Sequence, residues 1–342
     1  MSQIKKVGII GEGKMGSGIF NWLVDFDFAL SWVCSCEADT SKIIRQFGKK
    51  IQRSLDAGII DRKRYEILQQ TSISCDMNTL QDCDLVIEAI PENLELKRSL
   101  FLQLDNIVNA EAIFTSNSSS INPSEIAPPG KRSGLFAGLH FFYPVLLKNI
   151  VELTLSADTS IQTNIALESF LTNIRKRFIT LEEKNSFILN KIFLDFQNEA
   201  YKIVKSGHCT YAQLDQLVKN HIFSFGVFDF CDSVGIDTMF ASVQNYTRDY
   251  PHKDYYSQFL SALNDLISQG RLGAKSDDGF YKYPLAEFSD EQPAGSSDIV
   301  EHLRQTWLSA SKRFTAQSHI PIYDINWAIK EYFGIEKGPF DK

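Results

Sequence analysis

The sequence predicts an α/β fold in which a doubly wound parallel sheet is followed by an all-helical C-terminal part. In the first half, short apolar runs alternate with amphipathic helical patterns, which is typical of strands and helices in a parallel sheet. After about Glu183 the strand patterns stop, and helical patterns continue to about Gly270. A glycine-rich turn follows the first apolar run directly, as in strand–helix connections of such sheets.

Each predicted element rests on its apolar period. Apolar runs predict strands at residues 6–10, 29–34, 84–90, 112–116, 135–142 and 151–155. Helical periods predict helices at residues 14–26, 40–57, 92–106 and 187–204. A polar stretch rich in Pro, Gly and Ser at residues 289–297 predicts a linker, after which a helical pattern resumes. We therefore expect a sheet domain over residues 1–184, a helical domain over 185–284, and a linker with a helical tail over 285–342.

The composition narrows the classes of function. With 44% hydrophobic residues the chain can form a packed core, and its net charge of -7 argues against nucleic acid as the main partner. No signal-peptide pattern and no apolar run of membrane-span length is present, so we expect a cytoplasmic protein without a membrane partner. Cys34 and Cys36 lack a second Cys or His pair nearby, so no metal site is predicted.

The turn Gly11-Glu12-Gly13-Lys14-Met15-Gly16 fits the dinucleotide-binding pattern G-x-G-x-x-G of Rossmann-like domains. The first glycine permits a tight turn, the second lets a pyrophosphate approach the backbone, and the third lets the helix pack on the strand. The free N–H groups of the first helical turn then face the anion. We expect this turn, including Lys14 and Met15, to bind the cofactor.

The acid that usually follows the second strand and binds the ribose hydroxyls is missing. Ungapped counting places Cys34 there, and Glu37 is the nearest acid that can serve if the loop bends. No Arg stands beside Glu37 to bind a 2′-phosphate, since Lys42 and Arg45 are the first basic residues. The sequence therefore favours NAD, without excluding NADP.

Five segments together resemble the L-3-hydroxyacyl-CoA dehydrogenase family, over about Lys5 to Tyr283. They are residues 11–19 (GEGKMGSGI), 84–97 (DLVIEAIPENLELK), 115–121 (TSNSSSI), 138–145 (GLHFFYPV) and 271–283 (RLGAKSDDGFYKY). The resemblance implies a soluble oxidoreductase that transfers a hydride between NAD and the 3-carbon of an acyl thioester. It also implies a helical domain used for substrate binding and dimerisation.

Matching the motifs position by position implies four catalytic residues. His140 matches the general base, Glu152 the acid that pairs with it, and Ser119 and Asn190 match residues on the substrate side. Proton removal from a secondary alcohol suits an imidazole, and a carboxylate on its other nitrogen fixes the tautomer. His140 and Glu152 are 12 residues apart, which allows the chain to turn at Pro144 and return along a second strand.

The same matching implies further cofactor-binding positions. They are Ala89, Glu92, Lys97 and Asn117. On the helix after the second strand, basic side chains can contact CoA phosphates, although a solvated charged face is the commoner explanation of such a pattern. They are Lys42, Arg45, Lys49, Lys50 and Arg53.

Departures from the family pattern concern the substrate. Tyr143 stands where an active-site Asn is usual, and Asn185-Ser186 stands where Pro-Gly is usual. Tyr143 can narrow the pocket, or its hydroxyl can replace the amide as a donor. Together, these departures bear on the usual substrate of the family, a short or medium acyl-CoA.

The helical part carries a second signal. Residues 226–237 (GVFDFCDSVGID) resemble the start of the dimer-forming helices, so we expect a homodimer; the alternative is that these helices complete a monomer core. Residues 324–341 (DINWAIKEYFGIEKGPFD) resemble the same region again, as in a truncated second copy. If the tail is such a copy, residues 298–342 should pack on residues 205–283.

Three functions follow from these observations. The first is NAD-dependent interconversion of L-3-hydroxyacyl-CoA and 3-ketoacyl-CoA in fatty-acid metabolism. The second is a biosynthetic dehydrogenase that acts on a hydroxyacyl group bound to a carrier protein. The third is a non-catalytic dinucleotide-binding protein, against which the intact His140 and Glu152 argue.

Overall fold

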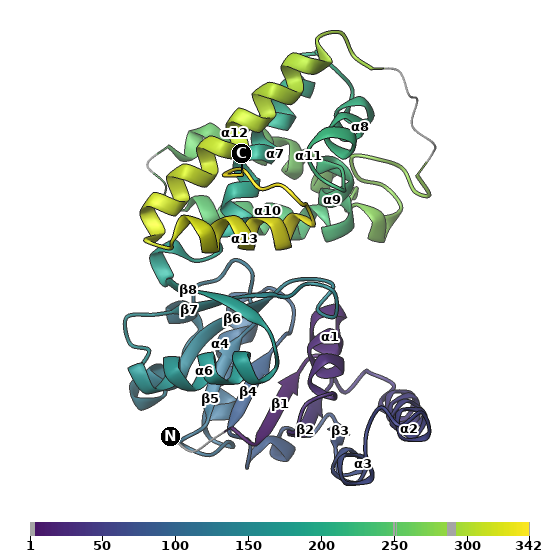
Figure 1. Ribbon diagram of the computed structural model, residues 1–342, viewed down its shortest axis with the longest axis vertical. Coiled ribbons are helices and arrows are strands. Elements are labelled where there is room, and N and C mark those ends of the chain that lie inside the picture. The colour runs from purple at the N-terminus through teal and green to yellow at the C-terminus, as the bar shows by residue number, and fades with distance from the viewer. Residues whose placement is uncertain (1–3, 249, 251, 286–291, 342) are drawn as a thin grey trace. The chain divides into compact units, whose positions relative to one another are not determined.

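The computed structural model describes residues 4–248, 250, 252–285 and 292–341. It divides into two compact units, Met1–Ser186 and Phe187–Lys342, which Figure 1 colours from purple to teal and from teal to yellow. Residues 289–291 of the predicted linker, and Lys342 at the end of the predicted tail, lie outside the described residues.

The first unit is built on one eight-stranded sheet in the order β3-β2-β1-β4-β5-β6-β7-β8. Neighbouring strands are parallel except for the antiparallel pair β6 and β7, so the predicted, mostly parallel sheet is confirmed. The strands are β1 (Lys6–Ile10), β2 (Ala29–Val33), β3 (Ser72–Ser74), β4 (Leu85–Glu88), β5 (Ile113–Ser116), β6 (Phe136–Phe141), β7 (Ile150–Leu155) and β8 (Arg177–Glu182).

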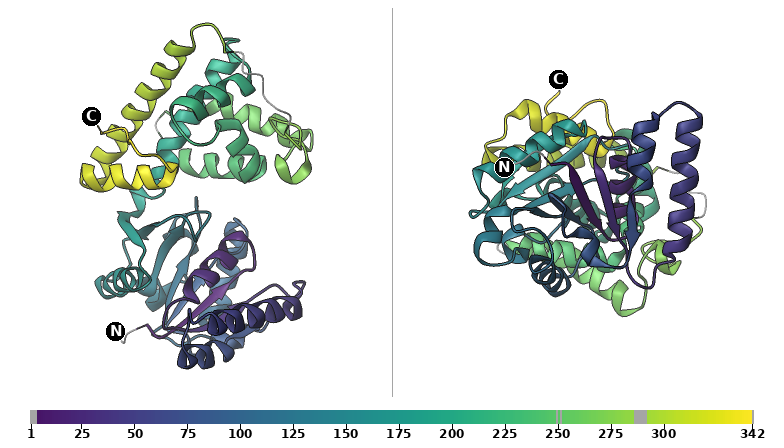
Figure 2. Two further views of the ribbon diagram at one scale, coloured as in Figure 1. Left: turned by 45° about the vertical axis from the view of Figure 1, so that its right-hand side comes forward. Right: turned by 90° about the horizontal axis from the view of Figure 1, so that it is seen from below.

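Helices cover both faces of this sheet because successive strand residues point to opposite faces. Ile9 belongs to one core cluster and the next residue, Ile10, to the other. The helices are α1 (Lys14–Leu23), α2 (Thr40–Asp56), α3 (Arg62–Gln69), α4 (Leu94–Asp105), α5 (Pro123–Ile126) and α6 (Ile161–Asn173). Figure 2 shows α2 and α3 side by side at the edge of the sheet formed by β2 and β3.

The second unit is a helical bundle around α7 (Ile188–Lys205), most of whose side chains are buried. The other helices are α8 (Tyr211–His221), α9 (Val227–Val234), α10 (Ile236–Thr247), α11 (Ser257–Ser268), α12 (Ser296–Ser318) and α13 (Ile322–Phe333). Within the described ranges, none of the helices combines the length and apolar character that a membrane span requires.

The tail formed by α12 and α13 packs on two parts of the helical unit. Its main contact is α12 along α7, which lies before residues 205–283. The expected region contributes α8, which α12 contacts, and Phe223, whose ring stacks on Phe333 at 4.2 Å and meets Trp307 edge-on at 5.2 Å. The predicted packing of the tail on residues 205–283 is therefore present, and the contact of α12 with α7 is an addition that the sequence did not predict.

Candidate active site

The glycine-rich turn follows β1 and has the backbone that its sequence predicts. Gly11 has φ +108°, a conformation that side chains rarely adopt, and its carbonyl accepts a hydrogen bond from Trp32 Nε1 at 2.8 Å. A Cβ on residue 16 would lie 2.1 Å from the Gly11 oxygen, so only glycine permits this packing of α1. The backbone of Ala89, at the end of β4, closes the other side of Gly11.

Gly13 forms the N-cap of α1 and leaves space in front of the helix. No side chain caps this end, and a Cβ on Gly13 would meet no atom within 4 Å. Free N–H groups at an uncapped helix start, with open space before them, suit a pyrophosphate. Lys14 is exposed, whereas Met15 is partly buried against the core, so the turn's residues fit a dinucleotide.

His140 and Glu152 meet across the antiparallel strands β6 and β7. They are directly opposite in the register, and His140 Nδ1 lies 3.0 Å from Glu152 Oε2. Both side chains are buried, Glu152 completely. The predicted contact is therefore present, and a fully buried carboxylate on Nδ1 holds the imidazole in one tautomer and orientation.

The loop that joins β6 to β7 is held in place by hydrogen bonds from a buried lysine. Lys176 Nζ donates to the carbonyls of Val145 and Lys148 at 2.6 and 2.7 Å, and it lies 3.7 Å from the Trp22 ring centre. Tyr143, on the same loop, is 58% exposed, and Lys14 Nζ of α1 lies 5.8 Å from its ring. The His–Glu pair is thus joined to the glycine-rich turn by contacts within one unit.

Glu92 organises the serine loop after β5. Its Oε1 accepts hydrogen bonds from the hydroxyls of Ser118 and Ser120 and from the N–H groups of Ser119 and Ser120. Burial alone would raise the pKa of Glu92, but Lys97 and these hydrogen bonds outweigh it and hold the pKa below its usual value. Ser118 and Ser120 are buried, whereas Ser119 is partly exposed, as a substrate-facing serine would be.

A buried ion pair lies beneath this loop, and the sequence did not single out its acid. Lys97 Nζ lies 2.6 Å from Glu88 Oε1 and 3.4 Å from Glu92 Oε2, and it also donates to the Ile90 carbonyl. Lys97 is only 1% exposed, so it supports the loops of the site from the protein interior. Any direct contact with a cofactor stays a prediction.

Asn117 ties the serine loop to the strand that carries His140. Its side-chain Oδ1 accepts a hydrogen bond from the backbone N–H of Phe141 at 2.9 Å, and its backbone N–H donates to the Glu88 carbonyl at 2.8 Å. The predicted positions 92, 97 and 117 therefore belong to one hydrogen-bonded assembly at the carboxyl ends of β4, β5 and β6. Ligands of doubly wound sheets bind at this edge.

Asn190 belongs to the second unit, in the first turn of α7. Its Nδ2 donates to the Tyr246 hydroxyl at 2.9 Å, and its Oδ1 accepts from the Tyr332 hydroxyl at 3.1 Å. Tyr332 lies on α13, so a tail residue fixes the orientation of this amide. The sequence carried no signal for that contact, because 142 residues separate the two partners.

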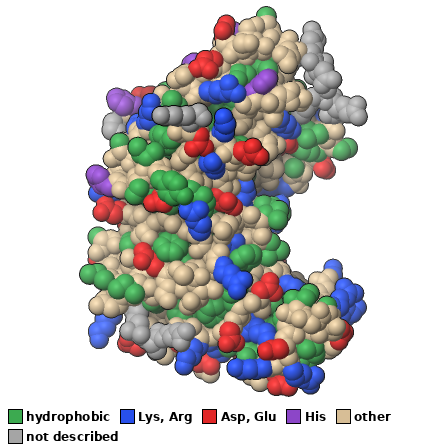
Figure 3. All heavy atoms as spheres, in the orientation of Figure 1, with side chains coloured by type: hydrophobic (Ala, Val, Ile, Leu, Met, Phe, Trp, Pro, Cys, Tyr) green, Lys and Arg blue, Asp and Glu red, His purple; other side chains and the backbone are tan. Residues whose placement is uncertain are grey.

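The basic face of α2 is largely exposed. Figure 3 shows Lys and Arg side chains gathered with acids over α2 and α3. Of the five basic residues that could contact CoA phosphates, Lys50 differs from the exposed others. It is partly buried, and its Nζ donates to Asn21 Oδ1 of α1 at 2.9 Å.

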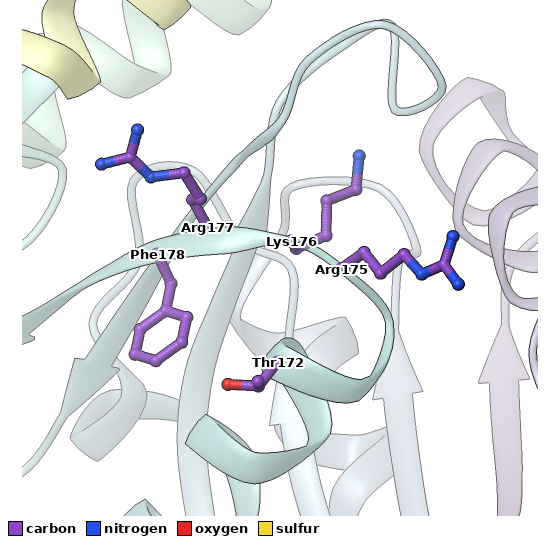
Figure 4. A pocket seen from close by; sticks show the side chains of 5 residues that line it. All are labelled: Thr172, Arg175, Lys176, Arg177 and Phe178. Carbon is purple, nitrogen blue, oxygen red and sulfur yellow. The ribbon is translucent and has the colours of Figure 1, made fainter.

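A hollow of about 410 Å³ at the turn between α6 and β8 also carries basic residues. Figure 4 shows that Arg175 and Arg177 point in opposite directions, while Lys176 points toward the β6–β7 loop, whose carbonyls it binds. These side chains do not converge, so the hollow has no arrangement that would hold an anion.

Comparison with known proteins shows the family. The family model of the 3-hydroxyacyl-CoA dehydrogenase NAD-binding domain matches residues 6–184, and that of the C-terminal domain matches residues 187–283. The chain belongs to the 3-hydroxyacyl-CoA dehydrogenase family. It is therefore an oxidoreductase with the NAD-binding domain of that family.

Relatives and solved structures agree with this assignment. The mitochondrial hydroxyacyl-coenzyme A dehydrogenase of Mus musculus is 31% identical over 82% of this chain and 91% of its own length. The structure of (S)-3-hydroxybutyryl-CoA dehydrogenase from Ralstonia eutropha is 28% identical, with a TM-score of 0.71 over 83% of this chain and all of that chain. A 3-hydroxybutyryl-CoA dehydrogenase from Escherichia coli shares the fold at 20% identity, with a TM-score of 0.78 over 99% of this chain and 91% of that chain.

Proposed function

We propose that this enzyme interconverts L-3-hydroxyacyl-CoA and 3-ketoacyl-CoA with NAD, in fatty-acid metabolism. The observation that carries the proposal is the 3.0 Å contact of His140 with a buried Glu152, at the sheet edge to which the glycine-rich turn also belongs. An imidazole held by a carboxylate beside a dinucleotide site suits removal of a hydroxyl proton.

The proposed roles follow from the chemistry of alcohol oxidation. The substrate loses a proton from its 3-hydroxyl and a hydride from C3, and NAD supplies the hydride acceptor when bound. Glu152 holds Nδ1 of His140, so the hydroxyl proton passes to Nε2, and Glu152 stabilises the imidazolium that forms. Ser119 is proposed to bind the substrate oxygen, and Asn190 is proposed to be a further residue on the substrate side.

The test is the consumption of NADH with 3-ketoacyl thioesters. We expect turnover with acetoacetyl-CoA, and initial rates over C4 to C16 ketoacyl-CoAs give the preferred chain length. NADPH in place of NADH tests the cofactor. Turnover with the acetoacetyl carrier-protein thioester alone would favour the biosynthetic alternative, and binding without turnover on any thioester would favour a non-catalytic protein.

A cytoplasmic homodimer completes the proposal. The resemblance of residues 226–237 to dimer-forming helices supports the dimer, and light scattering of the intact chain tests it. A monomer would mean that the helices around α7 only complete a core. Some relatives carry the word mitochondrial in their names, so imaging of a tagged full-length protein decides the compartment.

The tail is proposed to be the start of a second helical domain. In the helical domain that precedes the tail, Gly226 approaches Asp215 so closely that a Cβ on Gly226 would lie 2.5 Å from the carboxylate. Phe228 donates its N–H to Asp215 Oδ1 at 3.0 Å. The tail repeats both contacts, since a Cβ on Gly338 would lie 2.2 Å from Asn326 Oδ1. The same Oδ1 accepts the N–H of Phe340 at 3.2 Å.

A further inference from the structure

The position that usually supplies a ribose-binding acid holds a neutral group in this chain. Cys34 follows β2 directly and is buried. Burial, with the nearby Glu12 and Cys75, raises the pKa of the Cys34 thiol to about 11. A buried thiol of this kind is neither an anion nor a strong acceptor for a pair of ribose hydroxyls.

Glu12 brings a carboxylate to the same strand end from the glycine-rich turn. Ser35, the residue after Cys34, donates its N–H to Glu12 Oε2 at 3.0 Å and its hydroxyl to Oε1 at 2.5 Å. Although burial acts to raise the pKa of Glu12, the hydrogen bonds from Ser35 outweigh it and lower the pKa. The carboxylate is therefore charged at neutral pH and fixed against the carboxyl end of β2.

Ser35 leaves the carboxylate with capacity for a ligand. Two carboxylate oxygens offer about four lone-pair sites, and Ser35 uses one on each oxygen. Each oxygen can still accept one hydroxyl, as the adjacent 2′- and 3′-hydroxyls of a ribose require. Within the described part of the chain, Glu12 has no Lys or Arg at ion-pair distance that would neutralise it.

We infer that Glu12 is the ribose-binding acid of this enzyme and the residue that selects NAD over NADP. The acid has moved from the end of the second strand to the glycine-rich turn, and Ser35 positions it. A 2′-phosphate would place a dianion against this carboxylate, which repels it. The inference rests on the proposed site of the dinucleotide and is independent of which acyl thioester the enzyme uses.

Titration calorimetry of NADH and NADPH without acyl substrate tests the inference, on the wild type and on Glu12→Gln. The amide keeps the shape of Glu12 and removes its charge. We expect the NADH dissociation constant to rise roughly 10-fold or more, because hydrogen bonds to a charged group are lost. The NADPH dissociation constant should stay equal or fall. The ratio of the NADPH to the NADH dissociation constant should therefore decrease by at least the same factor.

Glu37→Gln supplies the matched comparison, since it removes the other carboxylate near this strand end and tests the residue expected from the sequence. Loss of NADH affinity in Glu37→Gln with none in Glu12→Gln would overturn the inference. Unchanged cofactor preference in a folded Glu12→Gln protein would overturn it as well. A wild type that binds neither cofactor would instead contradict the dinucleotide site itself, whatever the result with Glu12.

Ser35→Ala provides a second variant that keeps the carboxylate. If Ser35 positions Glu12, NADH affinity should fall, but by less than in Glu12→Gln, and NADPH should remain disfavoured because the charge is retained. A Ser35→Ala protein that favours NADPH would contradict the assignment of selectivity to Glu12.

Discussion

At the scale of single residues, the buried pair of Glu88 and Lys97 supports the loops at the edge of the sheet. Glu88 is completely buried, and besides Lys97 it accepts the N–H of Ile90 at 2.7 Å and the hydroxyl of Ser116 at 2.5 Å. A buried pair contributes little net stability when it is complete, but removing one partner leaves an uncompensated charge. The pair therefore fixes the geometry of this edge more than it stabilises the fold.

A double-mutant cycle on this pair tests the interpretation. Lys97→Met alone should destabilise the protein by about 3–5 kcal/mol, because it leaves the buried carboxylate of Glu88 and the partly buried carboxylate of Glu92 without their cation. Glu88→Gln with Lys97→Met should cost much less than the sum of the two single changes. Urea denaturation followed by circular dichroism gives the four free energies of unfolding.

The exposed pair Arg62 and Glu66 is the matched control for the cycle. Its side chains are 72% and 59% exposed, and its Nε–Oε1 distance is 3.1 Å. Arg62→Met and Glu66→Gln should couple by less than about 1 kcal/mol. Equal coupling in the two cycles would mean that Lys97 and Glu88 do not interact as a buried pair.

At the scale of elements, a buried aspartate joins three segments of the helical unit. Asp215 of α8 accepts the N–H groups of Phe228 and Asp229 at the start of α9, each at 3.0 Å, and the hydroxyl of Tyr281 at 2.9 Å. Burial raises the pKa of Asp215 to about 6 although these hydrogen bonds act to lower it. The start of α9 is therefore held by a carboxyl group that titrates in a mildly acidic range.

The pH dependence of stability tests this group. Its pKa in the folded state is above the unfolded value of about 3.9, so its contribution is fully present below that value and is lost as the pH rises through about 6. Asp215→Asn has no such titration. The free energy of unfolding of the wild type minus that of Asp215→Asn should therefore fall as the pH rises from about 4 to about 6.5. Denaturant titrations of both proteins measure it, and a constant or rising difference would contradict the assignment.

The elements that the sequence predicted are those with a strong apolar period. β1, β2 and β4–β7 fall within mostly apolar runs, whereas β3 has only three residues and half of the residues of β8 are polar. The His140–Glu152 contact was predicted from the resemblance to the family, and the antiparallel pairing of β6 with β7 brings the two residues opposite each other. The contacts of Glu88 and Tyr332, and the role proposed for Glu12, were missed because they depend on partners that only the folded chain brings near.

At the scale of the whole chain, the tail adds a residue to the proposed substrate machinery. The family models end at residue 283, yet Tyr332 of α13 donates to Asn190. The ring of Tyr332 also packs edge-on against Phe333 at 4.7 Å, so the hydroxyl and the ring have separate tasks. The tail thus completes the core of the helical unit and fixes one amide.

Tyr332→Phe separates those tasks because it removes the hydroxyl and keeps the ring. If Asn190 binds substrate as proposed, kcat/KM for the ketoacyl-CoA should fall several-fold, by about 1 kcal/mol, with NADH affinity unchanged. Tyr323→Phe on the same helix is the control, since Tyr323 is 77% exposed. An equal effect of both changes, or none from Tyr332→Phe, would remove Tyr332 from the site.

The central claim is that His140, held by Glu152, moves the hydroxyl proton. The most direct measurement compares turnover of acetoacetyl-CoA and binding of NADH in His140→Gln and in the wild type. We predict that kcat falls by about 100-fold or more while the NADH dissociation constant stays within roughly twofold, because only proton transfer is lost. Turnover that survives the substitution, or NADH binding that disappears with it, would show that His140 has a structural role and would contradict the claim.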